Sequence, residues 1–420
     1  MSITRTLPGW LNNAFFDGAH FANVYTLLSE REAKRERARS ASRNRDDDSK
    51  TRRAGKAFIA PFSRTIPSDH LDHYSIEYGS RPEHLPFNRY YAIEPHERTR
   101  VGVCFPASSD DEYLNANWVR ELHGGQWWIA TQAPLPNTAY AYLSLFFQPA
   151  TRPPPSIAGM REGECTIPPE GECRLRTSVQ LTVAYEGGRT KAHPYFPTEV
   201  GESYVIPPPP SDTTTTPHPR IKIKLASQTV AKETHSITSR LQLSLIEPDS
   251  NAERGQPFEI THHLFTHWPD FGIPSSPEDQ RALLAFVRFV AASNRLTSTP
   301  EAHLDPPIAL NCSAGIGRTG SFIALSSLLR SHGLLLSEYP PTSPTCPFTS
   351  VVKRFPSLPP SPLGPLPDFV AGDEVVFEID SLREQRTSMV QRDEQHLLIY
   401  HLLREAYNER YAEEEQKQWT

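Results

Sequence analysis

Proline is the feature of this sequence that most restricts its fold, because 41 of the 420 residues are proline and many of them are clustered. Three stretches hold ten, six and five prolines respectively: residues 340–367, 207–219 and 153–169. Proline fixes φ and lacks an amide donor, so these stretches cannot form central strands or helix interiors. We expect one enzyme-sized body with proline-rich surface insertions, whose composition also suits docking of SH3 or WW domains. The predicted bounds of the insertions are 151–175, 203–220 and 337–372.

The remaining composition excludes several classes of protein. No stretch approaches the roughly 18 apolar residues of a membrane-spanning helix, and the N-terminus lacks the apolar core of a secretory signal. The five cysteines are an odd number and argue against a disulfide framework, so we expect a reducing, cytoplasmic environment. A net charge of −6 gives no overall signature of nucleic-acid binding.

A charged segment precedes the main body. Residues 31–56 contain eleven lysines and arginines and five acidic residues, including an Asp46–Asp48 run. We expect a helix that leads into a solvated charged linker, with a nuclear-localisation signal as the alternative. The chain is therefore divided into an N-terminal helical segment with linker, residues 1–56, and a globular domain, residues 57–420.

Strand and helix patterns interleave along that domain. Alternating or short apolar runs predict strands at residues 113–119, 126–131, 178–185, 221–230, 239–248, 257–268 and 307–312. Helical spacing predicts helices at residues 277–295, 321–335 and 394–416. This order predicts an α/β (α+β) fold: a single domain with a central twisted mixed sheet flanked by helices.

The most informative segment joins the predicted strand 307–312 to the helix after it. Small residues follow Cys312, so backbone amides can turn inward and form a concave site for a phosphate-sized anion at the helix N-terminus. The residues of this nest are Ser313, Ala314, Gly315, Ile316 and Gly317. Arg318 can bind two oxygens of the same anion. We call residues 312–318 the phosphate loop.

Cys312 lies at the mouth of this loop. The amides and Arg318 would stabilise its thiolate, which could attack a bound phosphoryl group and form a phosphocysteine. Thr319 could hydrogen-bond the sulfur and make it a better leaving group in the second step. A buried structural cysteine is the alternative interpretation of Cys312.

Two other motifs in the sequence allow alternative interpretations. Gly315, Gly317 and Gly320 fit the dinucleotide-binding pattern, but a proline-rich segment follows the helix instead of further strand–helix units. His262, His263 and His267 invite a metal interpretation. Alternation along a strand separates neighbouring side chains, and no acidic or cysteine partner lies at ligand spacing, so we interpret these histidines as structural and expect no metal.

The phosphate loop, in NCSAGIGRTG, resembles the signature of the cytosolic, cysteine-based, non-receptor protein tyrosine phosphatases. Other segments resemble that family's motifs in the family's order: the recognition loop (residues 87–93, FNRYYAI), DEYLNANWV, WIATQAPLPNT, YEGGRTKAHPYFP, the lid loop (residues 267–274, HWPDFGIP) and the glutamine loop (residues 386–400). The resemblance implies that residues 57–420 are a catalytic domain that hydrolyses phosphotyrosine in proteins without a cofactor.

The resemblance also implies roles for individual residues. Asp270, which follows Trp268, would be the general acid and then the base, and Gln391 would position the hydrolytic water. Tyr90 would line the pocket and favour phosphotyrosine over the shorter phosphoserine. The other residues implied are Asn88 and Gln395 in substrate binding and Glu186 and Lys191 in orienting Arg318 and Asp270.

Three positions depart from the family pattern. Asn311 stands before the nucleophile where histidine is usual, which predicts a weaker bias towards the thiolate. Ala92 replaces the acid that usually holds the peptide backbone, although Tyr91 could compensate, and Arg392 replaces a small hydroxyl residue. A pseudophosphatase that binds phosphotyrosine without turnover is therefore the alternative function, and a dual-specificity phosphatase, which lacks the recognition loop, is another.

Overall fold

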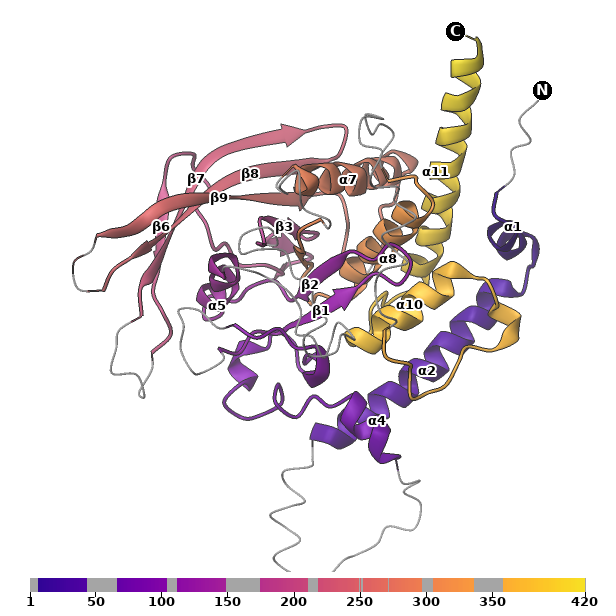
Figure 1. Cartoon of the computed structure of the whole chain (residues 1–420), viewed down its shortest axis with the longest axis horizontal. Coiled ribbons are helices and arrows are strands. Elements are labelled where there is room, and N and C mark those ends of the chain that lie inside the picture. The colour runs from indigo at the N-terminus through magenta and orange to yellow at the C-terminus, as the bar shows by residue number, and fades with distance from the viewer. Residues whose placement is uncertain are drawn as a thin grey trace, which may run out of the picture.

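The computed structural model describes residues 7–43, 66–103, 112–148, 174–210, 218–248, 250, 252–270, 272–296, 305–335 and 358–419. Its centre is an eight-stranded mixed sheet in the order β1-β2-β10-β3-β9-β8-β7-β6 (Figure 1). β10 pairs in parallel with β2 and β3, and β3 with β9, whereas the remaining neighbours are antiparallel. Helices flank this sheet, so the predicted fold class is confirmed.

The predicted strands form, with shifted ends. The strands of the main sheet are β1 (Ala116–Arg120), β2 (Trp127–Thr131), β3 (Thr177–Gln180), β6 (Ser203–Ile206), β7 (Arg220–Ala231), β8 (Ser236–Ile246), β9 (Glu253–Phe265) and β10 (Ile308–Asn311). β4 (Tyr185–Glu186) and β5 (Arg189–Thr190) form a separate small hairpin. In β7 the buried Ile221 and Ile223 alternate with half-buried Lys222, as the period of two predicts.

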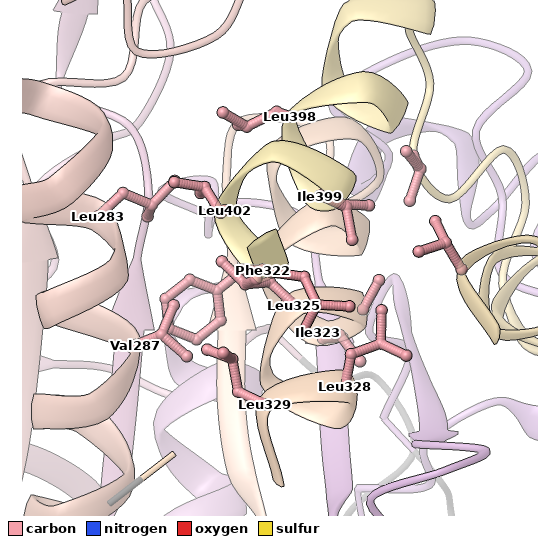
Figure 2. Close-up of a cluster of buried hydrophobic side chains, with 14 of the residues drawn as sticks. Leu283, Val287, Phe322, Ile323, Leu325, Leu328, Leu329, Leu398, Ile399 and Leu402 are labelled. Atoms are coloured by element: carbon pink, nitrogen blue, oxygen red, sulfur yellow. The ribbon is translucent and has the colours of Figure 1, made fainter. Parts of the chain in front are cut away.

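Helices α7 (Pro277–Arg295), α8 (Gly317–Ser331) and α11 (Asp393–Trp419) build the core behind the phosphate loop. Figure 2 shows their apolar side chains meeting, with Val287 of α7, Phe322 of α8 and Leu402 of α11 among them. α8 is buried along nearly its whole length. The rigid helix that follows Cys312 is therefore fixed by packing on several sides. No helix within the described ranges is long and apolar enough to cross a bilayer.

The other helices are shorter than these three, apart from α2 (His20–Arg43), which has 24 residues. The α-helices are α1 (Gly9–Phe16), α2 (His20–Arg43), α4 (Ser68–His73), α5 (Ala139–Ser144) and α10 (Glu374–Gln385). The 3₁₀ helices are η1 (Leu85–Phe87), η2 (Glu97–Thr99), η3 (Leu145–Phe147) and η5 (Asp368–Val370).

The charged N-terminal segment differs from the prediction. α2 lies against α10 (Figure 1), and its Val24 and Leu28 belong to the main core. Arg35 is fully buried and pairs with Asp380 at 2.6 Å and Glu384 at 2.5 Å. The predicted helix is confirmed as α2, but the prediction that this charged segment is solvated is wrong for Arg31 and Arg35, because carboxylates distant in sequence pair with both. Residues 44–56 of that prediction lie outside the described residues.

Each predicted insertion includes residues that belong to the packed domain. Ser203–Ile206 contains no proline and pairs with β7 as an edge strand, and β7 itself begins at Arg220, so the bounds 203–220 are wrong at both ends. In the range 337–372, Val370 is buried at the end of η5, and in the range 151–175, Leu175 is buried. Packing within the domain therefore begins before each predicted insertion ends. Residues 149–173, 211–217 and 336–357 lie outside the described residues.

Candidate active site

The phosphate loop lies at the carboxyl end of β10, between its parallel neighbours β2 and β3. This edge of a parallel sheet is where ligands bind in α/β folds. Gly315 has a φ of +72°, and a Cβ on it would lie 2.1 Å from the carbonyl oxygen of Thr131. A Cβ on Gly320 would lie 2.4 Å from the amide nitrogen of Val390. The close approach of these two backbones therefore requires glycine at both positions.

Cys312 is 4% exposed, and its Sγ accepts a hydrogen bond from the Gly315 amide at 3.3 Å. Burial by itself would raise the pKa of the thiol. The charge of Arg318, with Thr319 and the Ile316 amide near the sulfur, outweighs burial, so the pKa of Cys312 lies below its ordinary value. The Thr319 hydroxyl is buried and has no hydrogen-bond partner within the described residues, so it is available to donate to the sulfur. The site therefore favours the thiolate form of Cys312.

Arg318 is the centre of the charged network. Its two Nη atoms bind the two carboxylate oxygens of Glu186 at 2.9 and 3.0 Å, a bidentate ion pair. Burial lowers the pKa of Arg318, but Glu186, Cys312 and Asp270 together raise it above its ordinary value. The arginine therefore stays charged in a buried site, and Glu186 fixes the plane of its guanidinium.

Asp270 lies on the other side of Arg318. Its Oδ1 accepts a hydrogen bond from Arg318 Nη2 at 3.1 Å, and its Oδ2 pairs closely with Lys191 Nζ. The carbonyl of the buried Trp268 accepts a hydrogen bond from Arg318 Nη1 at 2.8 Å. These contacts draw the described part of the lid loop towards the phosphate loop, with its carboxylate beside the arginine.

Tyr90 joins the recognition loop to the phosphate loop. Its hydroxyl lies 2.7 Å from Ser313 Oγ, and Ser313 Oγ donates to the Lys191 carbonyl at 2.7 Å. With that proton committed to the carbonyl, the Tyr90 hydroxyl is the donor to Ser313. This chain of bonds holds Tyr90 against the phosphate loop.

The two glutamines occupy different environments. Gln391 is exposed, and its Cβ lies 3.4 Å from the point that a Cβ on Gly317 would occupy. Gln395 is buried and binds Arg392 and Gly272: its Oε1 accepts from the Arg392 amide at 3.3 Å and its Nε2 donates to the Gly272 carbonyl at 3.5 Å. Both glutamines therefore lie beside the phosphate loop, and Gln395 also contacts the lid loop.

The structure adds detail at two positions of the recognition loop, Asn88 and Ala92. The side chain of Asn88 is engaged within the protein: Oδ1 accepts from Tyr113 and Asn115, and Nδ2 donates to the Gly79 carbonyl. This geometry supports the loop. Ala92 has a φ of +66°, uncommon for a residue other than glycine.

Arg386 and Asn311 also form hydrogen bonds with the backbone of the phosphate loop. Arg386 is fully buried and donates to the carbonyls of Gly315 at 2.7 Å and Ala314 at 3.1 Å. Burial lowers the pKa of Arg386 to about 10, so it is still cationic at neutral pH. Sequence reasoning missed this residue, although it begins the glutamine loop and its position there was a usable signal. Asn311 donates to the Cys312 carbonyl at 3.1 Å, while its buried Oδ1 has no hydrogen-bond partner among the described residues.

Comparison with known proteins bears on this geometry. A family model described as protein-tyrosine phosphatase matches residues 84–151 and 172–333, more than half of the chain. The human receptor-type tyrosine-protein phosphatase eta is 27% identical over 242 residues, which cover 58% of this chain and 14% of that protein. The human tyrosine-protein phosphatase non-receptor type 14 is 27% identical over 255 residues, which cover 59% of this chain and 17% of that protein. The aligned region is thus less than a fifth of the length of either relative.

A solved structure supports the same fold. The catalytic domain of human protein tyrosine phosphatase non-receptor type 18 matches with a TM-score of 0.51 and 22% sequence identity. The match covers 79% of this chain and 88% of that chain. At this level of identity the likeness shows the fold alone, because the chemistry depends on the residues of the site.

Proposed function

Because the chain belongs to the protein-tyrosine phosphatase family, we propose that it hydrolyses phosphotyrosine in proteins through a phosphocysteine on Cys312. The observation that carries this proposal is a buried cysteine whose pKa is lowered, with Arg318 and Asp270 beside it. A thiolate, a fixed cation and a carboxylate are the three groups that a two-step phosphoryl transfer needs.

In the first step the Cys312 thiolate attacks phosphorus and the bond from phosphorus to the tyrosine oxygen breaks. The amides of Ser313, Ala314, Gly315, Ile316 and Gly317 and the guanidinium of Arg318 hold the three equatorial oxygens. Asp270 donates a proton to the departing tyrosine oxygen. The products are a phosphocysteine and a neutral tyrosine.

In the second step water attacks the phosphocysteine and the S–P bond breaks. Gln391 positions the water, and Asp270, now a carboxylate, accepts its proton. The Thr319 hydroxyl stabilises the departing thiolate of Cys312, and inorganic phosphate leaves. We keep Gln395 in substrate binding and assign Trp268, Glu186 and Lys191 to positioning. For Asn88, predicted to bind substrate, we propose instead that its hydrogen bonds hold the recognition loop.

Substrate choice would depend on Tyr90. Its bond to Ser313 supports a role in setting the depth of the site, which would exclude the shorter phosphoserine and phosphothreonine. The test is phosphate release from matched phosphotyrosine and phosphoserine peptides. Comparable rates on both peptides would favour the dual-specificity alternative.

A pseudophosphatase that binds phosphotyrosine without turnover is the second candidate, favoured by Asn311 and its unpartnered Oδ1. Phosphate release by the wild type and by Cys312→Ser separates the two candidates. The enzyme proposal requires release by the wild type alone. Equal background rates, with peptide still bound, would establish the binding protein instead.

Other predictions concern the rest of the protein. The docking of SH3 or WW domains stays a prediction, because the proline-rich segments concerned lie largely outside the described residues. The cytoplasmic or nuclear location also stays a prediction. We also keep residues 57–420 as the proposed catalytic domain, with α1 and α2 packed on it.

A further inference from the structure

Two histidines and an aspartate meet at the edge of the site, from three separate parts of the chain. His235 is in the turn before β8, His267 follows β9, and Asp279 is in the first turn of α7. The pairing of Ser236 with Phe265 brings the start of β8 beside the end of β9. The Thr266 amide then donates to the His235 carbonyl at 3.0 Å, which fixes the two histidines as neighbours.

The potential ligand atoms of this cluster lie close together. One ring nitrogen of each histidine and one carboxylate oxygen of Asp279 all lie within 4.8 Å of one another. His235 Nδ1 and Asp279 Oδ1 are 3.0 Å apart, and the two imidazole centroids are 4.1 Å apart. A tetrahedral zinc ion with bonds of roughly 2.1 Å keeps its ligand atoms about 3.4 Å apart. Small side-chain rotations would therefore close the cluster around an ion.

The surroundings orient these groups. Ser276 donates to Asp279 Oδ2 at 2.6 Å, which leaves Oδ1 directed at His235, a typical arrangement around a metal-binding carboxylate. That hydrogen bond from Ser276, with the nearby His267 and His235, lowers the pKa of Asp279. His235 has a φ of +42°, an uncommon conformation that places its ring against Asp279. The exposed His267 leaves the cluster open to solvent for entry and for a fourth ligand.

The neighbouring histidines do not share these features. His262 and His263 are buried in β9, and burial lowers their pKa to about 3 and about 4. His263 lies within hydrogen-bonding distance of Thr238 and Ser293. The sequence groups His267 with these two residues because they are adjacent in the chain. The fold separates it and gives it ligand partners from other elements.

We propose that His235, His267 and Asp279 bind a divalent transition-metal ion of the zinc class. Water would complete the coordination. Imidazole and carboxylate ligands with an open fourth position suit zinc and its spectroscopic substitute cobalt.

The position of this site suggests what the ion would do. His267 directly precedes Trp268, whose carbonyl binds Arg318, and Asp270 binds the same arginine. An ion would tie the start of the lid loop to β8 and α7 while Asp270 is beside Arg318. Metal binding would therefore favour this position of the lid loop and regulate its movement. This regulatory step rests on the proposed function, whereas the binding of the ion does not.

The test is a titration of the full chain carrying Cys312→Ser with Co²⁺ and then Zn²⁺. The substitution removes the active-site thiolate, which is itself a metal ligand, and abolishes the proposed activity, so binding is measured independently of turnover. We expect one equivalent of Co²⁺ with the visible absorption of a tetrahedral site, displaced by Zn²⁺. His235→Asn, His267→Ala and Asp279→Asn should each weaken binding at least tenfold, roughly the cost of disturbing a metal site.

His70→Ala, a partly exposed histidine of α4, is the matched control and should leave the affinity unchanged. Thermal melting without metal checks that each variant is folded. Asparagine tolerates the positive φ of residue 235, so His235→Asn decides the question if Asp279→Asn disturbs the start of α7. Absence of stoichiometric Co²⁺ binding, or equal affinity in the folded ligand variants, would overturn the proposal and leave only an ion pair between His235 and Asp279.

Discussion

The phosphate loop and the recognition loop are joined by the bond between Tyr90 and Ser313, yet they are held in different ways. The phosphate loop is enclosed by β10, α8 and Arg386, and nearly all of its residues are buried. In the recognition loop the residues are half-buried, apart from Tyr91, which is 78% exposed and has the guanidinium of Arg43 over its ring. The comparison teaches that the loop proposed for chemistry is fixed by the core, whereas the loop proposed for peptide selection lies partly at the surface.

The largest predicted effect concerns Asp270, the proposed general acid beside the phosphate loop. Asp270→Asn keeps the shape of the side chain but cannot transfer the proton, so kcat on a phosphotyrosine peptide should fall roughly 10²–10⁴-fold. Steady-state kinetics at several pH values measures this effect. Asp368→Asn, at an exposed residue of η5, is the matched control and should retain wild-type kcat. A kcat within about twofold of wild type would remove Asp270 as the general acid.

Arg386→Met tests whether the phosphate loop depends on support from behind. The substitution leaves the carbonyls of Ala314 and Gly315 and the side-chain oxygens of Asn115 and Asn117 without this donor. Leaving such buried oxygens without their donor costs about 1–3 kcal/mol. Chemical denaturation should show this loss of unfolding free energy, with activity lost in parallel. Arg254→Met, at an exposed arginine, should change neither, and an equally stable Arg386→Met would show that the loop supports itself.

Ala92→Asp tests whether the recognition loop has lost a peptide contact. An aspartate there could accept hydrogen bonds from the peptide backbone, each worth about 1.5–3 kcal/mol when charged, so KM for peptides should fall about tenfold or more. Activity on a small aryl phosphate should not change. Ala92→Asn is the control, because it tolerates the same positive φ without the charge. An unchanged peptide KM would mean that another residue, such as Tyr91, already holds the peptide.

The smallest predicted effect concerns Asn311. In Asn311→His a protonatable ring would replace the amide next to the nucleophile and favour the Cys312 thiolate. Because a lower thiol pKa preserves the thiolate as pH falls, the acidic limb of the kcat/KM profile should move to lower pH. A gain of about threefold to tenfold in kcat/KM on that limb is expected. An identical pH profile would show that the identity of residue 311 has no effect on catalysis.

Sequence reasoning located the elements whose patterns are local. The strand–loop–helix around Cys312 was predictable because small residues, Arg318 and an apolar helix follow one another in the chain. α7 follows the prediction at both ends because Ser276 caps it and Pro277 suits the first helical position. β6 was missed because a four-residue edge strand beside prolines has almost no pattern of its own.

The features that escaped prediction depend on partners distant in the chain. Arg35 looked solvated because its carboxylates, Asp380 and Glu384, are about 350 positions away. Arg386 and the cluster of His235, His267 and Asp279 likewise acquire their roles only when separate elements meet. The proposed nucleophile and phosphate-binding arginine were accessible from sequence because one short loop holds both, whereas Arg386, which supports that loop, was not.

In the proposed mechanism the phosphoryl group passes through Cys312. The direct measurement is acid quench of an enzyme–phosphotyrosine peptide mixture during turnover, followed by mass spectrometry of the peptide that contains Cys312. Gln391→Ala, which should slow attack by water, would let the intermediate accumulate. One phosphoryl group on Cys312 is expected, and none in Cys312→Ser. Phosphate release without this adduct, or a phosphoryl group on another residue, would contradict this mechanism.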